Sequence, residues 1–135
     1  MQITNTILMI RPVNFRMNEQ TAVNNYFQEQ PEMLQEEVNR KAQQEFDVFV
    51  QKLKANGVHV IVVEDTKVPD TPDSIFPNNW VSFHNSGTVC VYPMFAENRR
   101  QERREDIFDV LETNGFEISN VMDYTAAEAE GVFLE

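Results

Sequence analysis

The sequence predicts an α/β protein that contains units in which two strands, a helix and a further strand follow one another. Three observations predict this class. Short runs rich in Val and Ile alternate with longer stretches whose apolar residues recur every three or four positions. A glycine follows each of the two helical stretches, where it would end a helix. The order strand, strand, helix, strand fits between residues 80 and 119.

Length and charge narrow the class of protein further. The chain has 135 residues, which suits one compact domain, and its net charge is −11. An acidic protein repels phosphate backbones and anionic lipid, so we expect neither nucleic acid nor a membrane as partner. Cys90 is the one cysteine, so no disulfide can form within the chain. Residues 1–11 have no signal-peptide pattern, and we expect a cytoplasmic protein.

The first half of the chain predicts a strand, a long loop, a helix and a second strand. Residues 7–10 form a short apolar run that reads as a buried strand, and residues 13–31 are a loop rich in Asn and Gln. Apolar residues then recur at helical spacing over 32–56, and Gly57 fits the position just after a helix. The β-branched run 58–63 predicts the second strand.

The middle of the chain predicts a polar loop followed by a hairpin. Residues 64–77 are polar and contain three prolines, which favours a loop. Residues 80–84 and 89–92 read as two strands, and Asn85–Gly87 supplies the turn between them.

The last part predicts a helix over 100–114 that ends at Gly115, and a short strand over 116–119. A polar, Ala-rich stretch follows, and residues 132–134 begin one more strand. Units of this kind bury their faces against neighbouring units. The chain is therefore expected to be part of a larger assembly, and we predict that it forms homo-oligomers or lacks a C-terminal part.

Acids and amides crowd the loop before the predicted hairpin. Asp70, Asp73, Asn78 and Asn79 lie within ten positions of one another. A carboxylate pairs with a planar guanidinium through two hydrogen bonds, and an amide oxygen accepts from the same group without adding charge. The loop could therefore hold a guanidino or ureido substrate. Composition alone favours the alternative, a solvated turn built of the residues that turns commonly use.

Four arginines lie where a loop meets the predicted helix. Arginines at such a junction can bind a substrate carboxylate. Acidic neighbours at Glu102, Glu105 and Asp106 instead favour surface ion pairs for the two later arginines. The candidates for a carboxylate site are therefore the two earlier ones. The four arginines are Arg99, Arg100, Arg103 and Arg104.

The two histidines and the cysteine give no sign of a metal or a nucleophile. His59 and His84 each lie in a predicted strand with no metal-ligand spacing around them, so we expect structural histidines and no metal site. Cys90 lies among valines in a strand, which predicts a buried, inert thiol. No cofactor is expected.

Several short motifs together resemble a known family. Residues 73–79 resemble the dimethylarginine-hydrolase pattern Asp-Ser-Val-Phe-Val-Glu-Asp, and 98–102 resemble that family's Ser-Arg-Arg-Lys-Glu. Residues 132–135 look like the start of its Leu-Glu-Gly-Gly-Asp motif. Stretches 9–15 and 21–28 resemble a bacterial amidinotransferase-like branch, some of whose members are linked to citrulline use. The resemblance covers nearly the whole chain.

The resemblance implies a fold, a chemistry and a set of residue roles. The fold would be a five-bladed α/β propeller of the pentein superfamily, of which residues 1–135 would form a single domain of about two blades. The chemistry uses a Cys nucleophile and a His acid/base. Asp73 would bind the guanidino group, Arg99 the substrate carboxylate, and Glu135 would be the acidic catalytic partner. The resemblance assigns further substrate-binding roles to Phe15, Asn78 and Asn79.

Two departures from the family pattern shape the functional hypotheses. Asn78 and Asn79 stand where the family has Glu and Asp, so a neutral ureido group such as that of citrulline fits the loss of charge. The catalytic His and Cys are expected beyond Glu135, and Cys90 cannot replace them because it lies between the Asp73 and Arg99 motifs.

The sequence leaves three hypotheses open. The first is the N-terminal part of a guanidino-modifying hydrolase or amidinotransferase, inactive by itself. The second is a non-catalytic binding or assembly module on the same scaffold. The third is an unrelated acidic α/β protein. Hydrolysis and amidino transfer are not distinguished, because water and an acceptor amine would attack the same thiol-bound intermediate.

Overall fold

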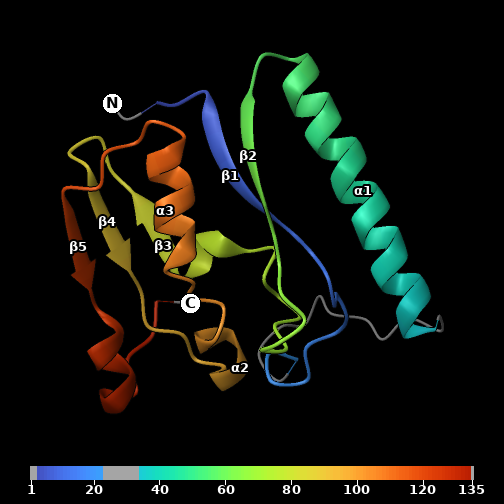
Figure 1. Cartoon of the computed structure of the whole chain (residues 1–135). Coiled ribbons are helices and arrows are strands. Elements are labelled where there is room, and N and C mark those ends of the chain that lie inside the picture. The colour runs from blue at the N-terminus through green and yellow to red at the C-terminus, as the bar shows by residue number, and fades with distance from the viewer. Residues whose placement is uncertain (1–2, 23–33, 135) are drawn as a thin grey trace. The chain divides into compact units, whose positions relative to one another are not determined.

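The computed structural model describes residues 3–22 and 34–134, which divide into two compact units, Ile3–Phe76 and Pro77–Glu135. Both contain helices and strands, so the mixed α/β class is confirmed (Figure 1). Within the described residues, no helix is long and apolar enough to span a membrane.

The first unit contains two parallel strands and the helix that connects them. Strand β1 (Thr6–Arg11) pairs with β2 (His59–Glu64), and α1 (Gln35–Ala55) lies between them in sequence. Both strands lie where the sequence predicts them. Parallel strands need such a crossover, because the chain must return to the same end of the sheet. The buried apolar core residues of this unit are Ile10, Val50, Val60, Ile61 and Val63.

Helix α1 ends as the sequence predicts. Gly57 has a left-handed backbone with φ of 84°. Its N–H donates to the carbonyl oxygen of Lys54 at 3.1 Å, and the N–H of Val58 donates to that of Leu53 at 3.1 Å. These two bonds satisfy the last carbonyls of the helix. Residues 32 and 33, with which the predicted helix begins, lie outside the described residues.

The second unit contains a three-stranded sheet in the order β3-β4-β5. Strands β3 (Val81–Phe83) and β4 (Thr88–Val91) form the predicted hairpin, and β5 (Asn120–Asp123) pairs parallel to β4. A short 3₁₀ turn, η1 (Pro77–Asn79), precedes the hairpin. The buried core contains Trp80, Val81, Val89, Cys90, Val91, Met94, Ala96, Ile107 and Leu111.

The predicted helix over 100–114 is wrong in its extent, because two helices occupy this region. These are α2 (Glu97–Arg100) and α3 (Asp106–Thr113). Between them, Arg103 donates from Nε to the carbonyl oxygen of Arg100 at 3.1 Å. A side chain thus satisfies a carbonyl that would otherwise need a continuing helix. The predicted stop at Gly115 is confirmed, with φ of 87°.

The strand predicted over 116–119 lies four residues later, at β5. The N–H of Ser119 donates to the carbonyl oxygen of Gly87 at 2.9 Å. A Cβ atom on Gly87 would lie 2.7 Å from Ser119 Oγ, so the hairpin turn closely approaches this segment. The parallel ladder with β4 therefore begins after that contact, at Asn120.

The strand predicted over 132–134 is also wrong. A 3₁₀ helix, η2 (Thr125–Glu130), is followed by irregular backbone. The N–H of Val132 donates back to the carbonyl oxygen of Ala127 at 3.1 Å, and that of Leu134 to Pro93 at 3.5 Å. These hydrogen bonds use the backbone N–H groups of Val132 and Leu134, so the segment does not pair as a β-strand.

Candidate functional site

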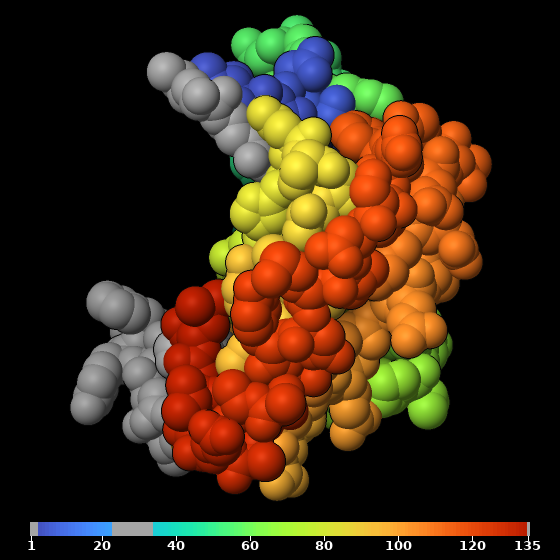
Figure 2. Space-filling view, turned by 90° about the vertical axis from the view of Figure 1, so that its left-hand side faces the viewer, coloured from blue at the N-terminus to red at the C-terminus, as the bar shows by residue number. Residues whose placement is uncertain are grey.

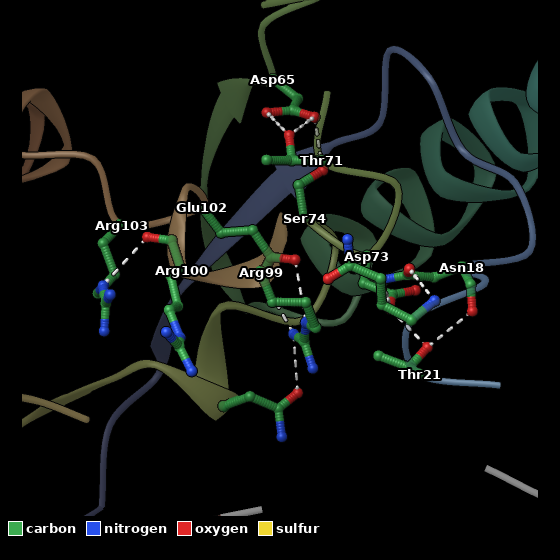
Figure 3. Close-up of polar contacts among 12 residues, drawn as sticks. Asn18, Thr21, Asp65, Thr71, Asp73, Ser74, Arg99, Arg100, Glu102 and Arg103 are labelled. Atoms are coloured by element: carbon green, nitrogen blue, oxygen red, sulfur yellow. Dashed lines mark hydrogen bonds and ion pairs between the residues drawn. The ribbon is translucent and has the colours of Figure 1, made fainter. Parts of the chain in front are cut away.

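In the first unit, the predicted substrate-binding carboxylate Asp73 is buried, with 5% of its surface exposed. Its Oδ2 atom accepts hydrogen bonds from Asn18 Nδ2 at 2.7 Å and from Thr21 Oγ1 at 3.2 Å (Figure 3). Asn18 is itself fully buried. Because both donors precede helix α1, the segment after β1 holds the Asp73 side chain in place.

A second loop carboxylate, Asp70, pairs with the same segment. Arg16 binds it through two parallel hydrogen bonds of 2.9 and 2.7 Å, and Asn14 Nδ2 also donates to it. The hydrogen bonds from Arg16 lower the pKa of Asp70 below its ordinary value. Asp70 therefore contributes to the structure of the loop and has Arg16 as its partner.

Phe15, predicted to bind substrate, is half-buried in this segment. Its N–H donates to Asn39 Oδ1 at 2.9 Å, and its carbonyl oxygen accepts from Gln35 Nε2 at 2.8 Å. Asn39 Nδ2 also donates to the carbonyl oxygen of Val13 at 2.8 Å. The polar face of α1 thus fixes the backbone on both sides of the Phe15 side chain.

In the second unit, Arg99 is buried, with 5% of its surface exposed. Glu102 binds it in a bidentate pair, with Nε–Oε1 of 3.0 Å and Nη2–Oε2 of 3.1 Å. Asn79 Oδ1 accepts from Arg99 Nη2 at 3.2 Å. The structure therefore brings together two predicted site residues, Asn79 and Arg99. The interpretation of Glu102 as a surface partner of the later arginines is wrong, because it is buried against Arg99.

The neighbouring arginines bind a carboxylate from η2. Glu128 pairs with Arg103 through Nη1, and with Arg100 at 3.4 Å between Nε and Oε2. Glu128 Oε1 also accepts from the N–H of Met94 at 2.9 Å. Burial by itself raises the pKa of Glu128, but the hydrogen bonds from Arg103 and Met94 outweigh burial and lower it. Arg104 pairs with Asp106, as a surface ion pair.

Glu128 and Asp65 are carboxylates that the sequence did not single out. Asp65 is buried and accepts from the hydroxyl groups of Thr71 and Ser74. Glu128 has its partners in another segment, and the polar loop that follows Asp65 does not indicate which of its hydroxyl groups contact that carboxylate. For Asn39, a signal did exist: Gln35, Asn39 and Gln43 recur every four positions along one face of the helix.

The other predicted residues are placed as follows. Asn78 is exposed in η1. Glu135 lies outside the described residues, so its catalytic role stays a prediction.

Cys90 is buried in β4, as predicted. His84 contacts Ser82 Oγ at 3.0 Å, and His59 is exposed in β2. Among the described residues, no three His, Cys, Asp or Glu side chains form a group that could hold a metal ion.

Two of the predicted site residues are buried and held by hydrogen bonds, one in each unit. The carboxylate of Asp73 can accept N–H groups from a planar guanidino or ureido group. The guanidinium of Arg99 can donate to a carboxylate.

Comparison with known proteins gives the family. The model of the eukaryotic N,N dimethylarginine dimethylhydrolase family matches residues 11–135, and the chain belongs to that family. Neither a curated protein nor a solved structure matches the sequence. The family predicted from the motifs is therefore confirmed, whereas its assignment to a bacterial branch stays a prediction.

Proposed function

We propose that this chain is the substrate-holding N-terminal part of an enzyme that modifies the guanidino or ureido group of an arginine- or citrulline-like amino acid. The observation that carries the proposal is the buried Arg99 guanidinium, which Glu102 and Asn79 hold in one orientation. A guanidinium held in one orientation can donate further N–H groups to a substrate carboxylate. The family supports the proposal, because its name gives a methylated arginine as substrate.

The two ends of the substrate are assigned to different residues. Arg99 binds the α-carboxylate, and Asp73 accepts N–H groups from the guanidino or ureido end. Asn78 and Asn79 add no charge, so the ligand is a neutral ureido amino acid in preference to a guanidinium. Phe15 supplies an apolar contact beside the substrate.

Catalysis requires groups beyond those described. A Cys thiolate attacks the central carbon of the guanidino or ureido group and displaces the amine, with a His as acid/base. We place both groups in a C-terminal part that this sequence does not include, and give Glu135 the role of acidic partner. The attacking species that releases the product is water or an acceptor amine.

The proposed architecture is a propeller of repeated α/β units. The element order β3, β4, α2, α3, β5 supports one such unit in Pro77–Glu135. The order β1, α1, β2 supports the later part of a second unit in Ile3–Phe76. An experimental structure of a longer gene product would test this, and strands that do not close around a central axis would contradict it.

Calorimetric titration of the purified 135-residue chain tests the substrate assignment. Citrulline is compared with N-carbamoylputrescine, which is the same molecule without the α-carboxylate, and with arginine. We expect citrulline to bind at least about tenfold more tightly than N-carbamoylputrescine, a difference of about 1.4 kcal/mol. We also expect it to bind more tightly than arginine.

Two variants and a matched control sharpen the test. Arg99→Lys keeps the charge but removes the two-pronged geometry, so it should abolish the difference between citrulline and N-carbamoylputrescine. Arg104→Lys, in a surface pair with Asp106, should keep that difference. Asn79→Asp should shift the preference from citrulline towards arginine. Equal affinity for ligands with and without the carboxylate would overturn the assignment.

A second candidate function is a non-catalytic binding or assembly module. The observation that favours it is Cys90, the one cysteine of the sequence, which is buried and unable to act as a nucleophile. Sequencing the gene beyond codon 135 distinguishes the two candidates. Further codons with His and Cys motifs support the enzyme, whereas a stop codon together with retained citrulline binding supports the module.

A further inference from the structure

We propose that Asp65 is a positioning residue, which fixes Asp73 for substrate binding by holding the hydroxyl groups on either side of it. The proposal rests on the proposed function, in which Asp73 accepts the N–H groups of the guanidino or ureido end. Asp65 lies directly after strand β2, eight positions before Asp73 in the chain.

Asp65 contacts the two ends of the short turn that carries Asp73. Asp65 Oδ2 accepts from Ser74 Oγ at 2.7 Å and from Thr71 Oγ1 at 3.1 Å (Figure 3). Ser74 adjoins Asp73, and Thr71 precedes it by two positions. The N–H of Ser74 donates to the carbonyl oxygen of Thr71 at 3.1 Å, which closes the turn. One carboxylate therefore ties down both ends of the turn that carries Asp73.

Asp65 is in turn anchored to the sheet. Its N–H donates to the carbonyl oxygen of Arg11 at 2.9 Å, one step beyond the last register pair, Arg11 with Glu64. Its backbone therefore continues the β1–β2 ladder. Asp65 therefore fixes the position of the turn relative to the β1–β2 sheet. This gives the polar loop, which contains three prolines, a defined geometry at Asp73.

Burial explains why a carboxylate suits this position. Asp65, Thr71 and Ser74 are 8%, 2% and 5% exposed, so water cannot replace the hydrogen bonds. A buried carboxylate is unfavourable unless it accepts hydrogen bonds, and here two hydroxyl groups of one turn supply them. An ionised carboxylate only accepts, so it requires both hydroxyl groups to donate inward.

The side chain of Asp73 is held by a different set of residues. Asn18 and Thr21 donate to its side chain, whereas Asp65 acts on the backbone of its turn. Different residues therefore fix the backbone and the side chain of Asp73. A change at Asp65 should therefore move Asp73 without removing a group that contacts its carboxylate.

The test measures each end of the ligand separately by calorimetric titration of the 135-residue chain. Citrulline against norvaline, which lacks the ureido group, reports the Asp73 end. Citrulline against N-carbamoylputrescine reports the Arg99 end. In Asp65→Asn, we expect the preference over norvaline to fall about tenfold and the preference over N-carbamoylputrescine to stay within about twofold. An effect on folding alone would weaken the binding of every ligand by the same factor and leave both preferences unchanged.

Further variants keep the proposal testable if Asp65→Asn does not fold. Ser74→Ala and Thr71→Val each remove one hydroxyl group and should lower the preference over norvaline. The loss in Asp65→Asn/Ser74→Ala should be smaller than the sum of the single losses, because both changes break the same contact. Lys67→Gln, at an exposed position in the same loop, should leave the preference unchanged.

The outcomes distinguish the two proposals. If the unaltered chain shows neither preference, the proposed function fails, and the positioning role fails with it. If the unaltered chain shows both preferences, and Asp65→Asn, Ser74→Ala and Thr71→Val keep the preference over norvaline, only the positioning role is overturned. A fall in both preferences by the same factor also contradicts it.

Discussion

Buried carboxylates organise this protein at the scale of single residues. Asp65 accepts from two hydroxyl groups, and Asp73 accepts from the Asn18 amide and the Thr21 hydroxyl group. The half-buried Glu128 pairs with arginines. A carboxylate removed from water needs such donors, since an unpaired buried charge is strongly unfavourable. The chain has 22 acidic residues, and the sequence does not show which of them are buried.

Glu128→Gln should destabilise the chain by about 1–3 kcal/mol at neutral pH, because it leaves Arg103 and the Met94 N–H less well satisfied. Urea unfolding measures the free energy of unfolding of both proteins. Glu117→Gln, at an exposed position, is the control and should change it by less than about 0.5 kcal/mol. An equal effect of the two substitutions would contradict the role of Glu128.

The pH dependence of that difference follows from the pKa of Glu128. The folded pKa is lowered from 4.5, so the pair stabilises the protein fully above the unfolded pKa. This contribution is lost as the pH falls through the lower, folded pKa. The gap in free energy of unfolding between the unaltered chain and Glu128→Gln should therefore shrink in acid. A gap that stays constant would count against the ion pair as its cause.

At the scale of elements, helix α1 packs with a polar face as well as an apolar one. Gln35, Asn39 and Gln43 bind carbonyl oxygens or N–H groups of the irregular segment after β1. Asp47 continues this face and pairs with Arg11 through bonds of 2.8 and 2.9 Å. Side chains thus satisfy backbone groups of a segment that has no ladder partner of its own.

Asn39→Ala should destabilise the chain by about 2 kcal/mol, because it breaks two hydrogen bonds to the backbone around Phe15. Gln44→Ala, on the exposed side of α1, should change stability by less than about 0.5 kcal/mol. Urea unfolding gives both values, and amide exchange at Phe15 should accelerate only in the first variant. Unchanged exchange at Phe15 would show that the contact does not hold the segment.

Gly57→Ala should destabilise the chain by about 1–2 kcal/mol, because a side chain disfavours the left-handed backbone. A Cβ atom there meets nothing within 4 Å, so the cost is conformational and not steric. Gly57→Asn should cost less, since Asn tolerates this backbone. The midpoints of thermal unfolding of the three proteins test the order, and equal losses for Ala and Asn would contradict it.

At the scale of the whole molecule, strand β5 is an exposed edge of its sheet within the described residues. The chain after α3, orange to red, lies open on the face shown in Figure 2. Val121, Met122 and Tyr124 are 46%, 41% and 44% exposed. An exposed edge strand with apolar side chains is a site where a second chain can pair.

We therefore expect the chain to self-associate through β5. Val121→Lys should shift the purified chain towards the monomer, because a charge on an edge strand opposes pairing. Val132→Lys, at an apolar position outside the sheet that is 56% exposed, is the matched control and should not. Light scattering over a range of concentrations measures the mass. A monomer at all concentrations in the unaltered chain would contradict this prediction.

The sequence by itself determined the α/β class, four of the strand positions, the helix ends at Gly57 and Gly115, the burial of Cys90 and the family. These features depend on local periodicity, on backbone preferences at glycine and on short motifs, which neighbouring residues encode.

Only the tertiary structure decided the break between α2 and α3, the position of β5 and the irregular path of residues 132–134. Specific contacts outweigh the periodic pattern, as Arg103 on the Arg100 carbonyl and Ser119 on Gly87 show. The burial and the partners of the charged side chains were likewise unpredictable. Arg99 and Glu102 are three positions apart, but their burial depends on the fold, and the pair of Glu128 with Arg103 depends on which segments the fold brings together.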